Sequence, residues 1–102
     1  MVTQNDRKPL FELGIHILST SAALDVMEEA GLTPASFIDR HVTGDFGNLC
    51  EEDRQLNLEA IKDGSRILSA YLVGNVKLYC ITEAEDDNGK RSATTILRAE
   101  EY

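Results

Sequence analysis

The sequence predicts an α+β domain in which an N-terminal strand and three helices precede a three-stranded antiparallel meander. Residues 11–18 alternate in hydrophobicity, residues 19–64 have helical spacing and capping residues, and residues 66–99 are rich in β-branched and aromatic side chains. We therefore expect a sheet of three to four strands with helices on one face. A chain of 102 residues has the length of one such domain.

The first strand is predicted within residues 11–18, because Leu13, Ile15 and Ile17 recur at every second position. It is short, and we expect it to add to one edge of the sheet. The preceding residues 1–10 are mostly polar, and we expect them to form a flexible N-terminus. The single globular domain is then expected to span residues 11–102.

Two helices follow, and each has its own start and stop signals. The first is expected within residues 19–31, where a hydroxyl side chain at position 19, 20 or 21 can cap it and Gly31 ends it. The second begins with Thr33 as the N-cap and Pro34 at the first helical position, a favoured combination because that N–H needs no partner. Gly44 is expected to end this helix.

A third helix is predicted from Glu51 to about Lys62, closed by Gly64. Acidic side chains in its first turn complement the helix dipole, but Cys50 occupies the capping position and specifies the start weakly. Asn57 lies among apolar positions, so we expect a buried amide bonded to the backbone. The side chains expected to face inward are Leu49, Leu56, Ala60 and Ile61.

The meander is predicted from strands at residues 66–73, 76–84 and 92–99. Gly74 and Asn75 make a tight first hairpin. Asn88 followed by Gly89 predicts a type I′ turn in the second hairpin.

Composition limits the classes of function. Eighteen acidic and ten basic residues give a net charge of −8 at pH 7, which disfavours direct binding to nucleic acid. The charge indicates either a partner with a basic surface or simply good solubility. The two cysteines, Cys50 and Cys80, lack any ligand or disulfide pattern and are expected to be reduced.

We expect no metal, because His16 and His41 lie on different elements, and no cofactor motif occurs. No signal peptide or membrane segment is visible, so a cytoplasmic location without membrane association is expected.

The stretch RHVTGDFGNL, residues 40–49, is the first candidate for a site. Here we expect His41 to point inward, while Asp45 is close enough to accept from it; a His–Asp pair can act as a general base. The alternative interpretation is a helix junction, in which Arg40 and His41 face the negative end of the helix dipole and Phe46 packs into the core.

A second candidate is a row of hydroxyl groups on the strands. Ser69 and Tyr71 share one face, Thr82 and Thr94 are expected on neighbouring strands, and Arg66 lies nearby in the sequence. Hydroxyls with an arginine can hold a phosphate. The alternative is the half-wet face of an antiparallel sheet.

Several segments together resemble a family of small accessory proteins of plasmids, prophages and integrative elements, whose activity is not established. They are RHVTGDFGNL, GSRILSAY, VKLYCITEA and SATTILRAEEY, and the resemblance covers residues 11 to 102. The family pattern has tryptophan where Phe46 and Tyr79 stand here, and its last hairpin is shorter. The resemblance carries over no catalytic residue. It implies a mobile-element protein, and such small acidic proteins often bind host machinery.

We therefore hypothesise a small acidic binding module, expected to be non-enzymatic, that inhibits a host defence or nucleic-acid-processing enzyme in the manner of anti-CRISPR or anti-restriction proteins. Its carboxylates would occupy a basic surface of that enzyme. The expected contact residues are Glu51, Glu52, Asp53, Glu83, Glu85, Asp86, Asp87, Glu100 and Glu101.

Two alternatives stay open. One is a small ribonuclease of the RelE or barnase type, in which His41 is the base, Arg66 stabilises phosphate, Arg40 orients it and Ser69 assists. The other is a self-associating structural protein, a homodimer that pairs through an exposed strand edge.

Overall fold

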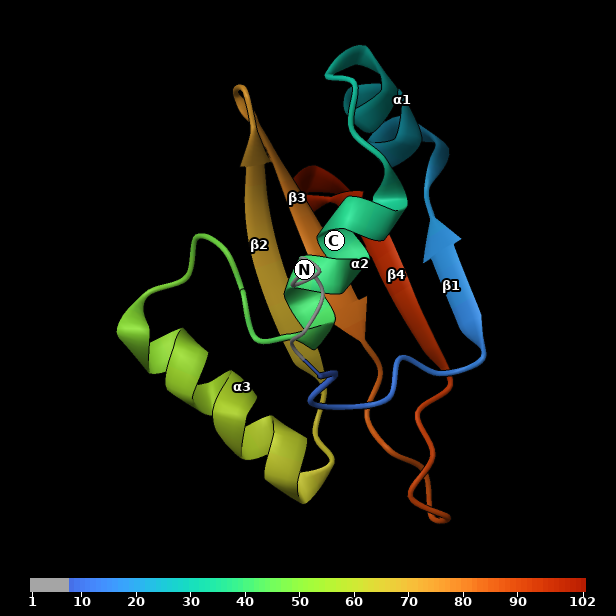
Figure 1. The fold of residues 1–102 in the computed structure, drawn as a ribbon, viewed down its shortest axis with the longest axis vertical. Helices are drawn as coiled ribbons and strands as arrows, with labels where there is room; N and C mark the ends of the chain where they lie inside the picture. The colour runs from blue at the N-terminus through green and yellow to red at the C-terminus, as the bar shows by residue number, and fades with distance from the viewer. Residues whose placement is uncertain (1–7) are drawn as a thin grey trace, which may run out of the picture.

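A computed structural model describes residues 8–102 and confirms the α+β class (Figure 1). Three helices and one four-stranded sheet make up the described chain. The elements, in order, are β1 (His16–Ser19), α1 (Ser21–Glu29), α2 (Pro34–Val42), α3 (Glu51–Asp63), β2 (Ile67–Val73), β3 (Val76–Thr82), β4 (Ala93–Arg98) and the short 3₁₀ helix η1 (Ala99–Glu101).

The sheet has the strand order β1-β4-β3-β2. Strands β2, β3 and β4 form the expected antiparallel meander, and β1 adds at the free edge of β4. The pairing of β1 with β4 is parallel, with Ile17 opposite Thr94, so the sheet is mixed. Hydrophobic alternation cannot reveal this direction, because it is the same for parallel and antiparallel neighbours.

Strand β1 is shorter than the predicted segment 11–18 and starts at His16. The reason is Gly14, whose φ of +89° breaks the extended backbone. A Cβ at this glycine would lie 2.5 Å from the backbone nitrogen of Ala93, so the chain approaches β4 too closely for any other residue.

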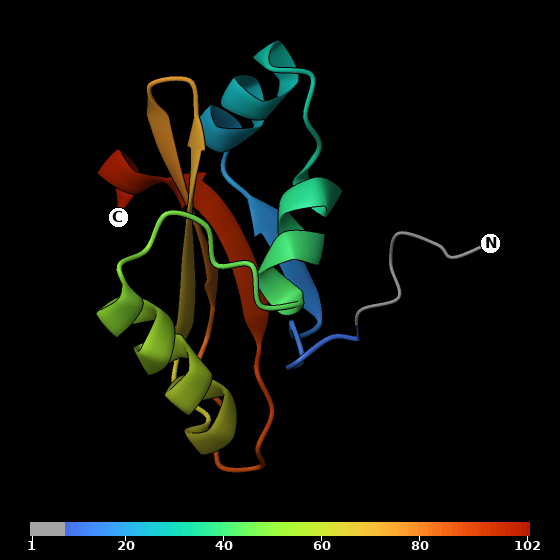
Figure 2. The ribbon, with the colours of Figure 1, turned by 60° about the vertical axis from the view of Figure 1, so that its left-hand side comes forward.

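Helices α1 and α2 cover one face of the sheet, and α3 lies beside its β2 edge (Figures 1 and 2). The expectation that all helices share one face is therefore wrong for α3. The main core lies between α1, α2 and the sheet and includes Met27, Phe37, Tyr71, Leu78 and Ile96. A second cluster, formed by Phe46, Ala60 and Ile67, joins α3 to the sheet.

The helix ends follow the capping signals. Thr20 accepts a hydrogen bond from the Ala23 amide at 3.1 Å, and Thr33 accepts one from Ser36 at 3.4 Å. Cys50 precedes α3 without a side-chain capping bond, and Gly64 ends α3 in the left-handed conformation.

Two local predictions need correction. Leu56 was expected to be buried against the sheet, but it is 60% exposed and borders an open groove with Leu68 and Tyr79. The reason is that α3 packs beside a sheet edge, which requires a narrower apolar stripe than a sheet face does.

The second hairpin does not contain a type I′ turn. Such a turn needs a positive φ at both central residues, whereas Gly89 has a positive φ and Asn88 does not. The Gly89 amide donates to Asp86 O at 2.9 Å, and the Asp86 amide donates to Lys90 O at 2.8 Å. This pattern fits a three-residue loop in which a type I turn is followed by a left-handed glycine.

The predicted flexible segment 1–10 falls mainly outside the described residues. Of its last three residues, Leu10 is held to α2 by a hydrogen bond from its amide to Val42 O at 2.8 Å. Within residues 8–102, no helix combines the length and the apolar character that crossing a membrane requires.

Candidate functional site

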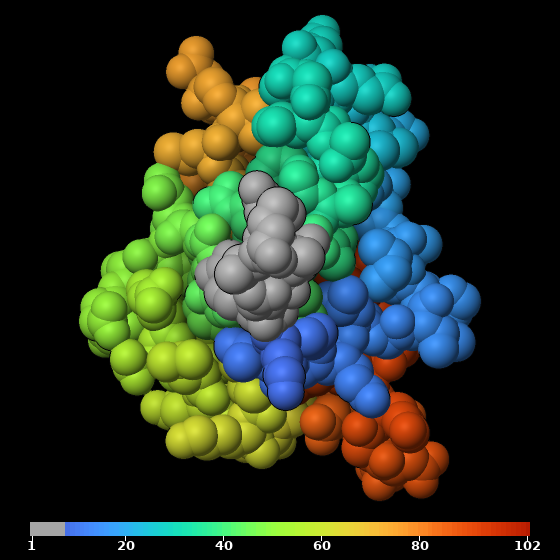
Figure 3. Space-filling view, viewed as in Figure 1, coloured from blue at the N-terminus to red at the C-terminus, as the bar shows by residue number. Residues whose placement is uncertain are grey.

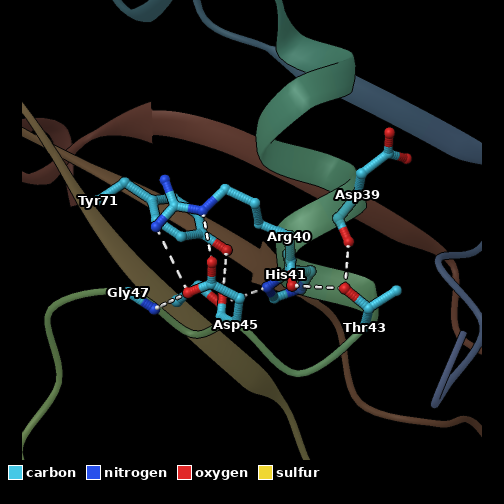
Figure 4. A network of polar contacts seen from close by, with 8 residues as sticks. Asp39, Arg40, His41, Thr43, Asp45, Gly47 and Tyr71 are labelled. Carbon is cyan, nitrogen blue, oxygen red and sulfur yellow. Dashed lines mark hydrogen bonds and ion pairs between the residues drawn. The ribbon is translucent and has the colours of Figure 1, made fainter. Parts of the chain in front are cut away.

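The junction after α2 is held by Arg40 and Asp45 (Figure 4). Arg40 Nε donates to Asp45 Oδ2 at 2.7 Å, and the guanidinium lies over the Tyr71 ring, 4.4 Å from its centre. The Asp45 carboxylate also accepts from the Gly47 amide, and Tyr71 Oη donates to Asp45 O at 2.6 Å. These bonds fix the loop that leads toward α3, so the interpretation of residues 40–49 as a helix junction is confirmed.

His41 points into the protein, as the sequence predicts. Its side chain has no solvent exposure, and its neighbours Phe37 and Ile38 are buried as well. Its Nδ1 lies 2.6 Å from Ser69 Oγ, and its Nε2 lies 2.8 Å from Thr82 Oγ1. Asp45, the expected partner of a general base, bonds to Arg40 instead.

The hydroxyl row continues beyond Thr82. Thr82 Oγ1 lies 2.7 Å from Thr94 Oγ1, and Thr94 Oγ1 donates to the backbone oxygen of Leu13 at 2.7 Å. Ser69, Thr82 and Thr94 are all fully buried. The row predicted from the sequence is therefore present, but it is neither a half-wet face nor an accessible phosphate site.

The direction of each hydrogen bond in this row follows from proton counting. Thr94 has one hydroxyl proton and gives it to Leu13 O, so Thr82 must donate to Thr94. His41 Nε2 must then donate to Thr82, which leaves Nδ1 of a neutral ring to accept from Ser69. The chain of donors runs from Ser69 through His41 to Leu13, and every proton in it is used.

His41 is neutral at physiological pH. Burial and, to a smaller extent, the positive charge of Arg91 together lower the pKa of its imidazole to about 4. The imidazole has both nitrogens bonded and no exposed surface. In this arrangement it links α2 to β2 and β3 and cannot take a proton from a substrate.

The structure does not bring the four residues of the ribonuclease alternative into one accessible site. Arg66 precedes β2, and its side chain donates to Tyr102 Oη and lies 5.3 Å from the centre of the Tyr102 ring. Side chains alternate between the two faces along the strand, so Arg66, three positions before Ser69, points to the opposite face of the sheet. Arg40 is committed to Asp45, whereas His41 and Ser69 are buried.

Asn57 fulfils its prediction. Its amide nitrogen donates to Leu68 O at 2.8 Å, and its amide oxygen accepts from Leu68 N at 3.1 Å. The side chain thus imitates a neighbouring strand at the β2 edge. Next to it, the Ala70 amide donates to Phe46 O, and Ala70 O accepts from the Asn48 amide. These bonds satisfy further outward backbone groups of the β2 edge.

Sequence reasoning missed Arg91, which is 6% exposed. Its guanidinium donates to the backbone oxygens of Ser65, Glu83 and Ala60 at 2.8 to 3.2 Å. A cation at the C-terminal end of α3 also complements the helix dipole. A single arginine after an acidic hairpin carries no sequence signal for such a role.

No family model, curated protein or solved structure matches the chain. The likeness to accessory proteins of mobile elements therefore stays a prediction, and the functional argument depends on the surface.

The acidic residues expected to bind a partner separate into two groups. Those of α3 and of the loop 83–90 meet, because the Glu85 amide donates to Gly64 O at 2.8 Å at the end of α3. We call residues 51–63 and 83–90 the acidic edge; together they hold nine carboxylates and three cations. Figure 3 shows the two segments in yellow-green and orange along the lower part of the molecule.

Glu100 and Glu101 are not part of the acidic edge. They lie in η1, at the opposite end of β4 from the loop 83–90. Glu100 pairs with Arg98 at 2.5 Å, and Glu101 accepts from Thr20 Oγ1 and from the Arg98 amide, both at 2.8 Å. Their carboxylates therefore serve contacts within the chain.

Proposed function

We propose that the protein is a small acidic binding module whose acidic edge occupies a basic surface of another protein. The proposal is supported by one observation: nearly all carboxylates of the acidic edge lack an ion pair with a cation of the described chain. Within residues 8–102, only Glu51 among its nine carboxylates forms an ion pair, with Arg54 at 3.7 Å. The remaining negative charge is exposed and available to a cationic partner.

One side of α3 supplies an apolar contact next to this charge. Leu56 is 60% exposed, and it borders a shallow hollow with Glu52, Gln55 and Glu59. An exposed leucine with carboxylates beside it fits a basic surface that also has an apolar patch. Charge then supplies the association rate and selectivity, while burial of the leucine adds affinity.

A surface that binds nucleic-acid phosphates is strongly basic, and carboxylates can compete for it. We therefore infer a nucleic-acid-processing enzyme as the partner, and inhibition as the effect. The likeness to mobile-element proteins favours a host defence enzyme, of the CRISPR or restriction class, as the form that this partner takes.

The test is an affinity pull-down of the tagged protein from a bacterial lysate at about 50 mM and about 500 mM salt, because exposed charges are screened at the higher concentration. We expect one nucleic-acid-binding protein to be retained at low salt and released at high salt. That protein, once purified, should lose its binding to a labelled oligonucleotide when the wild-type chain is added.

A matched pair of variants tests the surface. Glu52→Lys, Glu59→Lys and Asp87→Lys together reverse three exposed charges of the acidic edge and should abolish retention. The control carries the same charge change on α1, with Asp25→Lys, Glu28→Lys and Glu29→Lys, and should retain the partner. Equal loss in both variants would mean that net charge alone attracts the retained protein, and the proposal would be abandoned.

A further inference from the structure

The two edges of the sheet differ in whether their outward backbone groups are hydrogen-bonded. At the β2 edge, the outward backbone groups of Leu68 and Ala70 are bonded by Asn57, Phe46 and Asn48. At the β1 edge, no described residue pairs with the outward side of the strand. Figure 1 shows β1 at the right-hand border of the molecule with no element beyond it.

The outward backbone groups of β1 can be identified from its pairing with β4. The amides of His16 and Thr20 donate to Ser92 O and Ile96 O, so the even-numbered residues face β4. By alternation, the N–H and C=O groups of Ile15, Ile17 and Ser19 point away from the sheet. They form a short row of donors and acceptors open to another strand.

The side chains along this edge are apolar and exposed. Ile15 is 87% exposed, Ile17 48% and Leu18 51%. The strand has no charged residue, proline or bulge, which are the usual devices that prevent pairing between edges. The α3 part of the acidic edge lies at the opposite border of the sheet, whereas the loop 83–90 lies near the start of β1, where Asp86 and Lys90 border the same hollow as Ile15.

We propose that β1 pairs antiparallel with β1 of a second copy of this chain across a two-fold axis at Ile17. This axis places Ile17 opposite Ile17 of the second copy and Ile15 opposite its Ser19. All these residues point their backbone groups outward, so the open donors and acceptors face one another in register. On one face of the sheet, His16 would lie against Leu18 of the second copy.

A second copy fits this edge because the edge is self-complementary and uncharged. Two chains of net charge −8 repel least when they meet at a strip without carboxylates and keep their acidic α3 helices far apart. The dimer would have one sheet of eight strands, twice the four of each chain, with the α3 helices at its two ends. Seven strand spacings of about 4.8 Å place the outermost β2 strands roughly 34 Å apart.

The size of the contact sets the expected affinity. A strand of four residues makes a small interface, below the range of stable dimers, so we expect dissociation in the micromolar range. Sedimentation velocity across micromolar to millimolar concentrations should show a monomer–dimer equilibrium. Ile17→Lys places like charges opposite each other at the axis and should weaken the dimer about tenfold or more. The matched control Leu72→Lys, at an exposed position of β2, should leave it unchanged.

A second variant keeps the test decisive if Ile17→Lys fails to fold. In a Cys50→Ser background, Ile17→Cys would bring two thiols together at the axis, where the Cα atoms of a hydrogen-bonded pair lie about 5.5 Å apart, within the reach of a disulfide. Mild oxidation should then give a covalent dimer, and Leu72→Cys in the same background should give none.

Three results would overturn the proposal: a wild-type chain that is monomeric throughout, a dimer that survives Ile17→Lys, or capture of a strand from a different protein at β1. The dimer does not depend on the proposed function. Reversal of Glu52, Glu59 and Asp87 should leave it intact, so the two proposals can fail separately.

Discussion

His41 Nε2 lies 2.8 Å from Thr82 Oγ1, and this bond joins α2 to β3 where neither residue touches solvent. On the other side of the ring, Ser69 connects the same imidazole to β2. One side chain thus fixes a helix to two strands through two directed bonds. The residue that looks most like a catalytic base is in fact part of the interior framework.

Replacement of His41 should therefore destabilise the fold. His41→Ala leaves a cavity and deprives two buried hydroxyls of a partner, which we expect to lower the free energy of unfolding by about 3 kcal/mol. Urea denaturation followed by circular dichroism measures the change. The control His16→Ala removes an exposed imidazole and should stay within about 0.5 kcal/mol of the wild type. Comparable stability of the two variants would contradict the buried network.

Stability should also depend on pH through His41. Its folded pKa is about 4, below the value of 6.5 in an unfolded chain. Between these values the unfolded chain binds a proton that the folded chain does not, so stability falls as pH drops from 6.5 to 4, by roughly 3 kcal/mol in all. Backbone bonds from Lys90 and Asn88 hold the pKa of Asp86 below its ordinary range, so that carboxyl adds its own loss only at lower pH.

The measurement is a series of urea denaturation curves between pH 4 and pH 8 for the wild type and for His41→Ala. The decline between pH 6.5 and pH 4 should be present in the wild type and largely absent in the variant. An equal decline in both chains would assign the proton uptake to another group.

Asn57 should be as important as a core residue. Asn57→Leu keeps the volume but leaves Leu68 N–H and C=O without their partner, and we expect a loss of about 2 kcal/mol. Hydrogen exchange of the Leu68 amide should accelerate at the same time. The control is Gln55→Leu on the exposed face of α3, which should leave both quantities close to the wild type.

Gly47 and Gly31 provide a matched comparison of strain and space. Both have a left-handed backbone, with φ of 74° and 72°, so alanine is strained at either position by about 1 kcal/mol. A Cβ at Gly31 meets nothing within 4 Å, whereas one at Gly47 would overlap Ala70 O and the Tyr71 ring. Gly47→Ala should cost at least about 2 kcal/mol more than Gly31→Ala in thermal or urea unfolding. A similar cost for both would mean that the loop 45–49 can move away from β2.

The order and limits of the elements were largely predictable from the sequence. Thr20, Thr33 and Gly64 each act at a helix end through their own local chemistry, and such signals need no knowledge of the rest of the fold. The direction of β1 and the position of α3 depend on packing between distant segments. No local pattern contains that information, which is why the sheet was expected to carry all its helices on one face.

The candidate site shows the same division. The inward direction of His41 and the burial of Asn57 follow from helical spacing. The alignment of Ser69, Thr82 and Thr94 was foreseen as a row, but its burial beneath α2 was not. Arg91 had no signal at all, because its three acceptors are backbone oxygens from separate segments. Every residue type has a backbone oxygen, so a hydroxyl or guanidinium that bonds to the backbone has no characteristic partner residue that a sequence could reveal.

The place of β4 between β1 and β3 has a consequence for how the chain is made. β4 is the last strand in sequence, yet it is the neighbour of both β1 and β3. During synthesis, β1 therefore has no strand to pair with until β4, which begins at Ala93, has left the ribosome. Closure of the sheet joins segments from the two ends of the described chain, a contact that slows folding because a long loop must be ordered first. We expect the β2–β3 hairpin to form early and the N-terminal strand to be recruited last.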